Sequence, residues 1–150
     1  MTHTQPRRRN SGFTLIEVLL VLVILVVLAS LAVVAYGPIQ RRAKVDAAKS
    51  QVGLFKTPLQ TYQMTVGSFP TSAQGLAALI QAPADLPNPA KWDGPYLDTN
   101  VLPLDPWGNP YQYASPGTHN PDSFDVWSLG PDGVNGTADD IGNWNMEPSR

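Results

Sequence analysis

The segment from Phe13 to Tyr36 is almost entirely apolar and carries a single charge, on Glu17. As a helix, these residues would be roughly 36 Å long, enough to span a hydrocarbon core of about 30 Å. A charged carboxylate inside such a span costs about 2.5–3.5 kcal/mol even on mild insertion scales. We therefore predict a transmembrane helix over residues 13–36 and treat Glu17 as a functional residue.

A basic leader precedes this segment, with three arginines at positions 7–9 followed by Gly12. Positive charges tend to stay on the cytoplasmic side of a membrane, so residues 1–12 are expected to be cytoplasmic, although basic residues at 41–44 weaken this preference. In a secretory signal the cleavage site follows the apolar stretch. Here Gly12 comes before that stretch, so a cut at this glycine would leave the helix in the product. Composition also fits a signal anchor that is never cut.

A continuation of the helix is indicated beyond Gly37-Pro38, where apolar residues recur every three or four positions. Proline lacks an N–H group and crowds the preceding turn, so we expect a kink at this point. The spacing predicts an amphipathic helix over residues 37–64. Its apolar stripe consists of Val45, Ala48, Val52, Phe55, Leu59 and Tyr62. We expect the stripe to pack on the core of the domain that follows.

Residues 65–150 are predicted to form a small head domain with many turns, because most of the 15 prolines lie there. Residues 71–80 predict a short helix, and residues 81–95 an irregular loop. Alternating side chains at 111–113 and 124–129 predict strands. A small antiparallel sheet against the long helix would bury the apolar surface of both, so the expected fold class is α+β.

Composition and charge exclude several functional classes. The chain has no cysteine, so disulfides and thiolate sites are excluded. From residue 57 onward the charged residues are mainly acidic, which disfavours nucleic-acid binding. A basic patch at 41–49 is suited to lipid head groups or acidic neighbours. We find no catalytic triad, phosphate-binding loop or catalytic carboxylate pair and expect no enzymatic activity.

Three carboxylates, on Asp132, Asp139 and Asp140, fall within nine residues of a loop that also contains Gly133 and Gly136. Calcium binds six to eight oxygens in flexible geometry, which carboxylates and backbone carbonyls together can supply. The spacing is not that of an EF-hand. A polar loop built on Asx-turns is the simpler interpretation, and the residues alone slightly favour it.

The junction of Gly12 with Phe13-Thr14-Leu15-Ile16-Glu17 is followed in the head by a series of distinctive segments. These are Tyr62 to Gly67, Phe69-Pro70-Thr71, Gln74-Gly75-Leu76, Gly94-Pro95-Tyr96-Leu97, Asp105-Pro106-Trp107-Gly108-Asn109-Pro110-Tyr111 and Ser128-Leu129-Gly130-Pro131-Asp132-Gly133. The junction resembles the leader signal of the type IV pilin-like superfamily. With the head segments, the sequence resembles more narrowly the major pseudopilins of the type II secretion system.

The resemblance implies that a prepilin peptidase cuts between Gly12 and Phe13 and methylates the new amino group of Phe13. Opposite charges about 4 Å apart attract by about 4 kcal/mol at an effective dielectric of 20. The Glu17 carboxylate is therefore expected to neutralise this amine, in its own chain or in a neighbouring subunit, and to act in assembly. A glutamate that merely reaches the membrane surface or stays protonated is the simpler alternative.

The resemblance also implies a calcium site, with the side chains of Asp132, Asp139 and Asp140 and carbonyls near Leu129 and Val134 as ligands. The fold implied is pilin-like. The function implied is that of the major subunit of a periplasmic filament, the pseudopilus, which promotes export of folded proteins through the outer membrane. The implied partners are further copies of the chain, minor pseudopilins, the prepilin peptidase, the inner-membrane assembly platform and the membrane itself.

One departure from the family concerns proline. The family commonly has a helix proline at the position matching Val34, whereas this chain has Pro38, about one turn later. Two other functions stay open at this stage. One is a type IV pilus or competence pseudopilin, although the usual C-terminal cysteine pair is missing. The other is a membrane-anchored calcium-binding protein that never polymerises.

Overall fold

The computed structural model describes the backbone of residues 13–146 and the side chains of residues 13–30 and 37–146. The chain divides into two compact units, one ending at Gln40 and one starting at Arg41. The predicted leader and its Gly12 lie outside the described residues. Among the described residues, no helix combines the length and apolar character needed to cross a membrane.

Helix α1 extends over Leu15–Leu54 and passes through Pro38, and helix α2 follows over Lys56–Val66. The break at Phe55 has a local cause. Pro58 has no N–H group to donate to the carbonyl of Leu54, four residues earlier. Regular bonding resumes when the Leu59 N–H donates to the Phe55 carbonyl at 3.1 Å. Gly67 ends α2 in the left-handed conformation that suits a residue without a Cβ.

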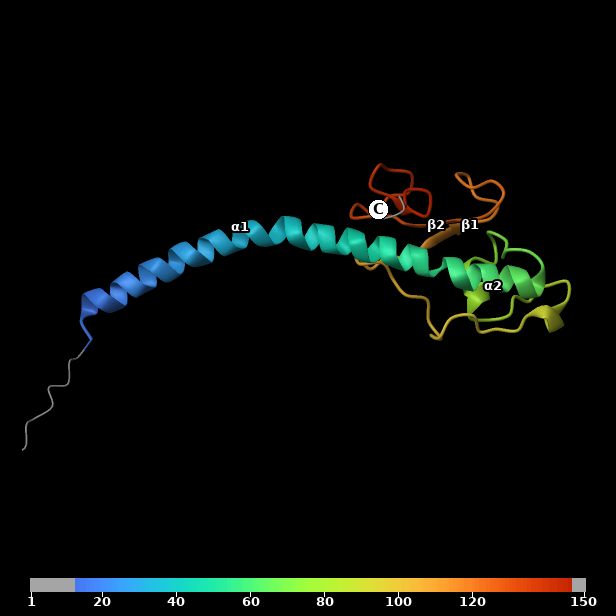
Figure 1. The fold of residues 1–150 in the computed structure, drawn as a ribbon, viewed down its shortest axis with the longest axis horizontal. Helices are drawn as coiled ribbons and strands as arrows, with labels where there is room; N and C mark the ends of the chain where they lie inside the picture. Colours follow the sequence, from blue (N-terminus) through green and yellow to red (C-terminus); the bar gives the residue numbers. More distant parts are fainter. Residues whose placement is uncertain (1–12, 147–150) are drawn as a thin grey trace, which may run out of the picture. The chain divides into compact units, whose positions relative to one another are not determined.

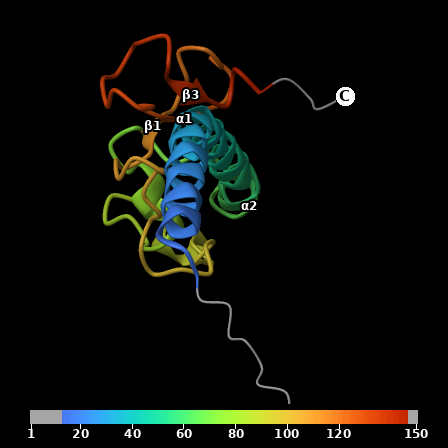
Figure 2. The same ribbon diagram turned by 90° about the vertical axis from the view of Figure 1, so that its left-hand side faces the viewer.

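The head contains a three-stranded antiparallel sheet in the order β1-β2-β3. The strands are β1 (Gln112–Ala114), β2 (Asp125–Ser128) and β3 (Ile141–Gly142). Tyr113 pairs with Val126, and Ser128 pairs with Ile141. Two of these strands match the predicted ones, and β3 is additional. Within the second unit, the strands lie beside the end of α1 and α2 (Figures 1 and 2).

The core of the head forms between the predicted helical stripe and the sheet. Val52, Phe55, Leu59 and Tyr62 are all at most 2 % exposed. The ring of Phe55 meets Tyr111 edge to face at 5.4 Å, and that of Tyr62 meets Tyr96 at 5.5 Å. The expected packing of the stripe on the head is therefore confirmed, and with it the α+β fold class.

The helix predicted over residues 71–80 is wrong in its type and extent. Thr71 and Gln74 hydrogen-bond each other reciprocally, as in a helix start. Gly75 then adopts a φ of 60°, which ends any α-helical path. The segment consequently forms turns, followed by the 3-10 helix η1 (Leu76–Leu79). A second 3-10 helix, η2, covers Pro89–Lys91 in the irregular loop.

Candidate functional site

At the N-terminal end of α1, Glu17 closes a reciprocal hydrogen-bonded cap with Thr14. The Thr14 N–H and hydroxyl donate to Glu17 Oε2 at 2.9 and 3.0 Å. The Glu17 N–H in turn faces the Thr14 hydroxyl oxygen at 3.4 Å. This is a capping box, in which two side chains satisfy N–H groups that the first helical turn leaves unpaired. The carboxylate is thereby fixed at the positive end of the helix.

Phe13 immediately precedes this cap and is 88 % exposed. The cap therefore holds the Glu17 carboxylate one helical turn from the residue whose amine a cut at Gly12 would create. Thr14 is the residue that the sequence interpretation overlooked. Its signal was present, because Thr-x-x-Glu before an apolar run is the sequence pattern of a capping box.

The loop between β2 and β3 contains the predicted calcium ligands. The Val134 N–H donates to Asp132 Oδ1 at 2.9 Å, which is an Asx-turn, and the Gly136 N–H donates to Asp140 Oδ2 at 2.7 Å. The Thr137 hydroxyl donates to Asp139 Oδ1 at 2.6 Å and holds the pKa of Asp139 below its usual value. The loop thus satisfies many of its own acceptors.

One buried carboxylate oxygen in this loop lacks a hydrogen-bond partner among the described residues. Asp140 Oδ1 is buried and, among the described residues, receives no hydrogen bond. A buried oxygen of this kind carries a free-energy cost unless a donor or a cation satisfies it. In the described part of the chain, however, no three acidic or histidine side chains come together as a metal site. Any ion here would therefore rely on backbone carbonyls as well.

The backbone of the loop is closed by Gly130, whose φ is 68°. A Cβ at this position would collide with the carbonyl of Asp139. A glycine is required for the two ends of the loop to approach each other this closely. The predicted carbonyl ligand Leu129 directly precedes it, and Asp140 directly precedes β3.

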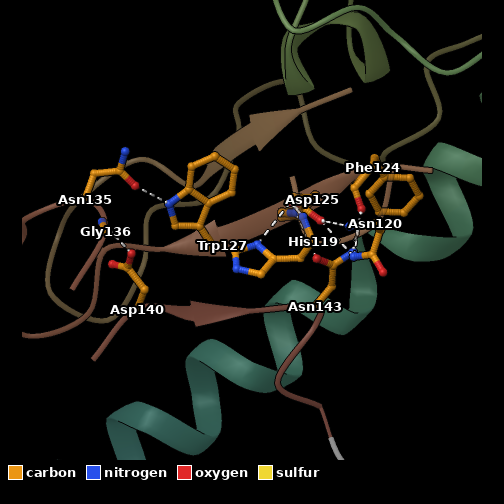
Figure 3. A network of polar contacts seen from close by, with 10 residues as sticks. His119, Asn120, Phe124, Asp125, Trp127, Asn135, Gly136, Asp140 and Asn143 are labelled. Atoms are coloured by element: carbon orange, nitrogen blue, oxygen red, sulfur yellow. Dashed lines mark hydrogen bonds and ion pairs between the residues drawn. The ribbon is translucent and has the colours of Figure 1, made fainter. Parts of the chain in front are cut away.

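A second polar centre surrounds Asp125, which is only 2 % exposed at the start of β2 (Figure 3). Its Oδ2 accepts the His119 N–H at 2.8 Å, and its Oδ1 accepts the Asn120 N–H and side-chain amide at 3.1 and 2.8 Å. Burial acts to raise the pKa of Asp125, but these bonds outweigh it and keep the pKa below its usual value. A Cβ at Gly117 would lie 2.6 Å from Oδ1, so the loop encloses the carboxylate closely.

The ring of His119 links this centre to the C-terminal segment. Its Nδ1 lies 3.3 Å from Asp125 Oδ2, and its ring stacks on Trp144 at 3.8 Å. Trp127, whose indole N–H donates to Asn135, lies 5.9 Å from Trp144. Sequence reasoning did not reveal this network around His119. The sequence shows only that an aspartate lies between Phe124 and Val126 in a predicted strand, which does not identify its partners.

The Asp105 side chain holds the turn that follows it. Asp105 Oδ1 accepts the N–H groups of Trp107 and Asn109 at 3.0 and 2.7 Å. Its Oδ2 accepts the Ser128 hydroxyl at 2.6 Å, which ties the turn to β2. Asp105 and Asp125 therefore each organise a loop of the head.

Comparison with known proteins assigns the family. A model of the prokaryotic N-terminal methylation motif matches residues 7–33, and the model described as type II secretion system (T2SS), protein G matches residues 36–144. The chain belongs to the protein G family of the type II secretion system. It is thus a major pseudopilin, the principal structural subunit of the type II secretion pseudopilus, which confirms the function predicted from the sequence.

Individual members of the protein G family are similar over almost their whole length. Type II secretion system core protein G of Pseudomonas aeruginosa is 46 % identical, over 92 % of this chain and 97 % of that protein. Its counterpart in Escherichia coli K12 is 38 % identical, over 95 % and 96 %. The crystal structure of the major pseudopilin from the type 2 secretion system of enterohaemorrhagic Escherichia coli superposes with a TM-score of 0.63, at 36 % identity, over 74 % of this chain and 95 % of that one.

Proposed function

We propose that the chain is cut from its leader, held in the inner membrane as a single-pass protein and then polymerised into a periplasmic filament. This filament promotes the export of folded proteins through the outer membrane. The observation that carries the proposal is the union in one chain of a methylation-motif N-terminus and a protein G head. The role is structural, so we assign no catalysed reaction to the chain.

The exposed apolar side chains of α1 support storage in the membrane followed by packing in a filament. The large apolar residues from Leu15 to Leu28 are all between 48 % and 87 % exposed. A helix that is apolar on every side needs lipid or other helices around it. The arginines at 7–9 favour a cytoplasmic N-terminus, which would place the head in the periplasm.

Processing and assembly are linked through Glu17. A cut after Gly12 converts the amide of Phe13 into an ammonium group beside the capping box. Glu17 Oε2 already accepts two bonds from Thr14, and a carboxylate has further lone pairs for the amine of its own or a neighbouring chain. In a medium of low dielectric, this pairing would favour a subunit that has been cut over one that has not.

Mass spectrometry of the protein from cells with a prepilin peptidase should give a chain that starts at N-methylated Phe13. Cells without the peptidase provide the control, in which the leader ending at Gly12 should be retained. An intact Met1 end in the peptidase-positive cells would contradict the processing step.

We also propose that the loop between β2 and β3 binds calcium. The unpartnered Oδ1 of Asp140 supports this, because it is the buried acceptor that a cation would satisfy. Because the three carboxylates do not come together in the described residues, Asp132 and Asp139 would have to move toward Asp140 on binding, and Leu129 and Val134 would supply backbone carbonyls. A bound ion would stabilise the loop by neutralising acids that lie close together in the sequence.

Calcium should raise the melting temperature of the full chain in detergent, and chelation should lower it again. Ligand at about 100 times its Kd adds about 2.7 kcal/mol of stability, so a shift of roughly 10 °C is expected. Asp140→Asn should abolish the gain, whereas Asp122→Asn, in an exposed loop, should retain it. If calcium leaves the wild-type melting temperature unchanged, the site does not exist.

The partners proposed follow from polymerisation and export. They are other copies of this chain, minor pseudopilins, the prepilin peptidase and an inner-membrane assembly platform. Energy would come from an ATPase elsewhere in the apparatus. The acidic head supports no role in nucleic-acid binding.

A further inference from the structure

The residues after Pro38 give α1 a basic surface. Arg41, Arg42, Lys44 and Lys49 are all exposed, and Asp46 is the only acid among them. Among the residues described, the only ion pair joins His119 to Asp125. The basic side chains of this segment therefore have no carboxylate partner there. On a helix Ile39, Arg42 and Ala43 share one face, and Ile39 is 64 % exposed.

An apolar groove with an acidic rim lies elsewhere on the head, between the end of α1 and the segment from Tyr96 to Pro103. Its volume is about 700 Å³, and its apolar lining includes Leu54, Pro58, Leu97, Val101 and Leu102. Leu54 is 62 % exposed and Val101 is 76 % exposed, so the groove is uncovered in the single chain.

The rim of the groove carries negative charge. Asp98 is exposed and is the only charged residue in the lining. Between Asp93 and Asp105 the sequence contains no lysine or arginine. A partner that presents an apolar side chain next to a positive charge would complement both the lining and Asp98.

We propose that this groove receives the basic segment of α1, residues 39–44, from a second copy of the chain. Ile39 and Ala43 would contact the apolar lining, and Arg42 would face Asp98. The same chain cannot fill its own groove in this way. Arg42 and Leu54 are twelve residues apart in one continuous helix, a separation of about 18 Å. The inference rests on the proposed polymerisation and specifies which surfaces meet.

The chain contains no cysteine, so an introduced pair can be tested without background. The full chain carrying Ala43→Cys and Val101→Cys, expressed with its secretion apparatus, should form disulfide-linked dimers and higher oligomers when filaments are oxidised. A disulfide requires Cα atoms about 4.4–6.8 Å apart, so such a ladder reports close contact between copies. Each single variant, and the pair Ala43→Cys with Thr118→Cys in another exposed loop, should give no ladder.

A charge exchange gives an independent readout. Asp98→Arg should lower the yield of sheared filaments roughly tenfold, because it sets like charges against each other. Adding Arg42→Asp should restore the yield to within about twofold. Filaments of normal yield without the 43–101 ladder would overturn the inference and leave the proposed function intact. A second outcome would also overturn it: Arg42→Asp alone lowers the filament yield, while Asp98→Arg neither lowers the yield by itself nor restores it in the double variant. Arg42 would then contact acidic lipid and not Asp98. Absence of filaments from the unmodified chain would overturn the proposed function itself.

Discussion

Replacing Asp125 with alanine should lower the free energy of unfolding of the head by about 3 kcal/mol. The carboxylate is almost fully buried and accepts bonds from the backbone and side chains of His119 and Asn120. Removing it leaves these donors without an acceptor and opens a space beside Gly117. The loss is a large fraction of the 5–15 kcal/mol that stabilises a typical domain.

The effect can be measured by tryptophan fluorescence during thermal unfolding of the full chain in detergent. All four tryptophans lie between residues 92 and 144, so the signal reports on the head. The melting temperature should fall by roughly 10 °C or more. Asp125→Asn keeps one acceptor oxygen, so its melting temperature should lie between those of the wild type and Asp125→Ala. Asp122→Asn is the exposed control. If it lowered the melting temperature as much as Asp125→Asn does, the account of Asp125 would be refuted.

The same network predicts a pH dependence. The pKa of Asp125 is lower in the folded chain than in the unfolded chain, where it is about 3.9. Its contribution is therefore fully present above about pH 5 and is lost as pH falls through the lowered pKa. The stability difference between wild type and Asp125→Ala should shrink below about pH 4. A difference that grew on acidification would contradict the sign of this shift.

The helical part of the fold could be predicted from the sequence because its signal is local and periodic. Val52, Phe55, Leu59 and Tyr62 recur with helical spacing, and all are buried. Strand β3 could not be predicted, since two residues, Ile141–Gly142, are too short to show alternation. They become a strand only because β2 offers them a partner.

The candidate site, too, could be predicted only where its signal is local in the sequence. Glu17 stands out because its charge conflicts with its apolar neighbours, and the comparisons assign residues 7–33 to the methylation motif. The partner Thr14 follows from a local pattern and could have been predicted. The network around Asp125 could not, because it depends on how the loop from Gly117 folds back on β2 and on the stacking of Trp144.

Replacing Glu17 with valine should abolish filament assembly while the protein still inserts and is still cut after Gly12. Valine lowers the cost of burial in the membrane, so insertion should be preserved or improved. It removes both functions of the carboxylate: closure of the capping box with Thr14, and neutralisation of the Phe13 amine. The expected effect is therefore close to complete.

A glutamine variant separates these two functions. Glu17→Gln keeps an oxygen that can accept the Thr14 bonds, since glutamine also serves in a capping box. It carries no charge to neutralise the amine. If neutralisation is the essential function, Glu17→Gln should fail to assemble almost as completely as Glu17→Val. Normal assembly of the glutamine variant alone would reduce Glu17 to a helix cap.

The central claim is that the cut chain polymerises through Glu17 to drive export. The most direct test is a strain whose only copy of the chain carries Glu17→Val, assayed for the mature N-terminus, sheared filaments and released exoproteins. We predict a chain starting at Phe13, no filaments, and folded exoproteins retained in the periplasm. Filaments and exoprotein release at wild-type levels would contradict the account.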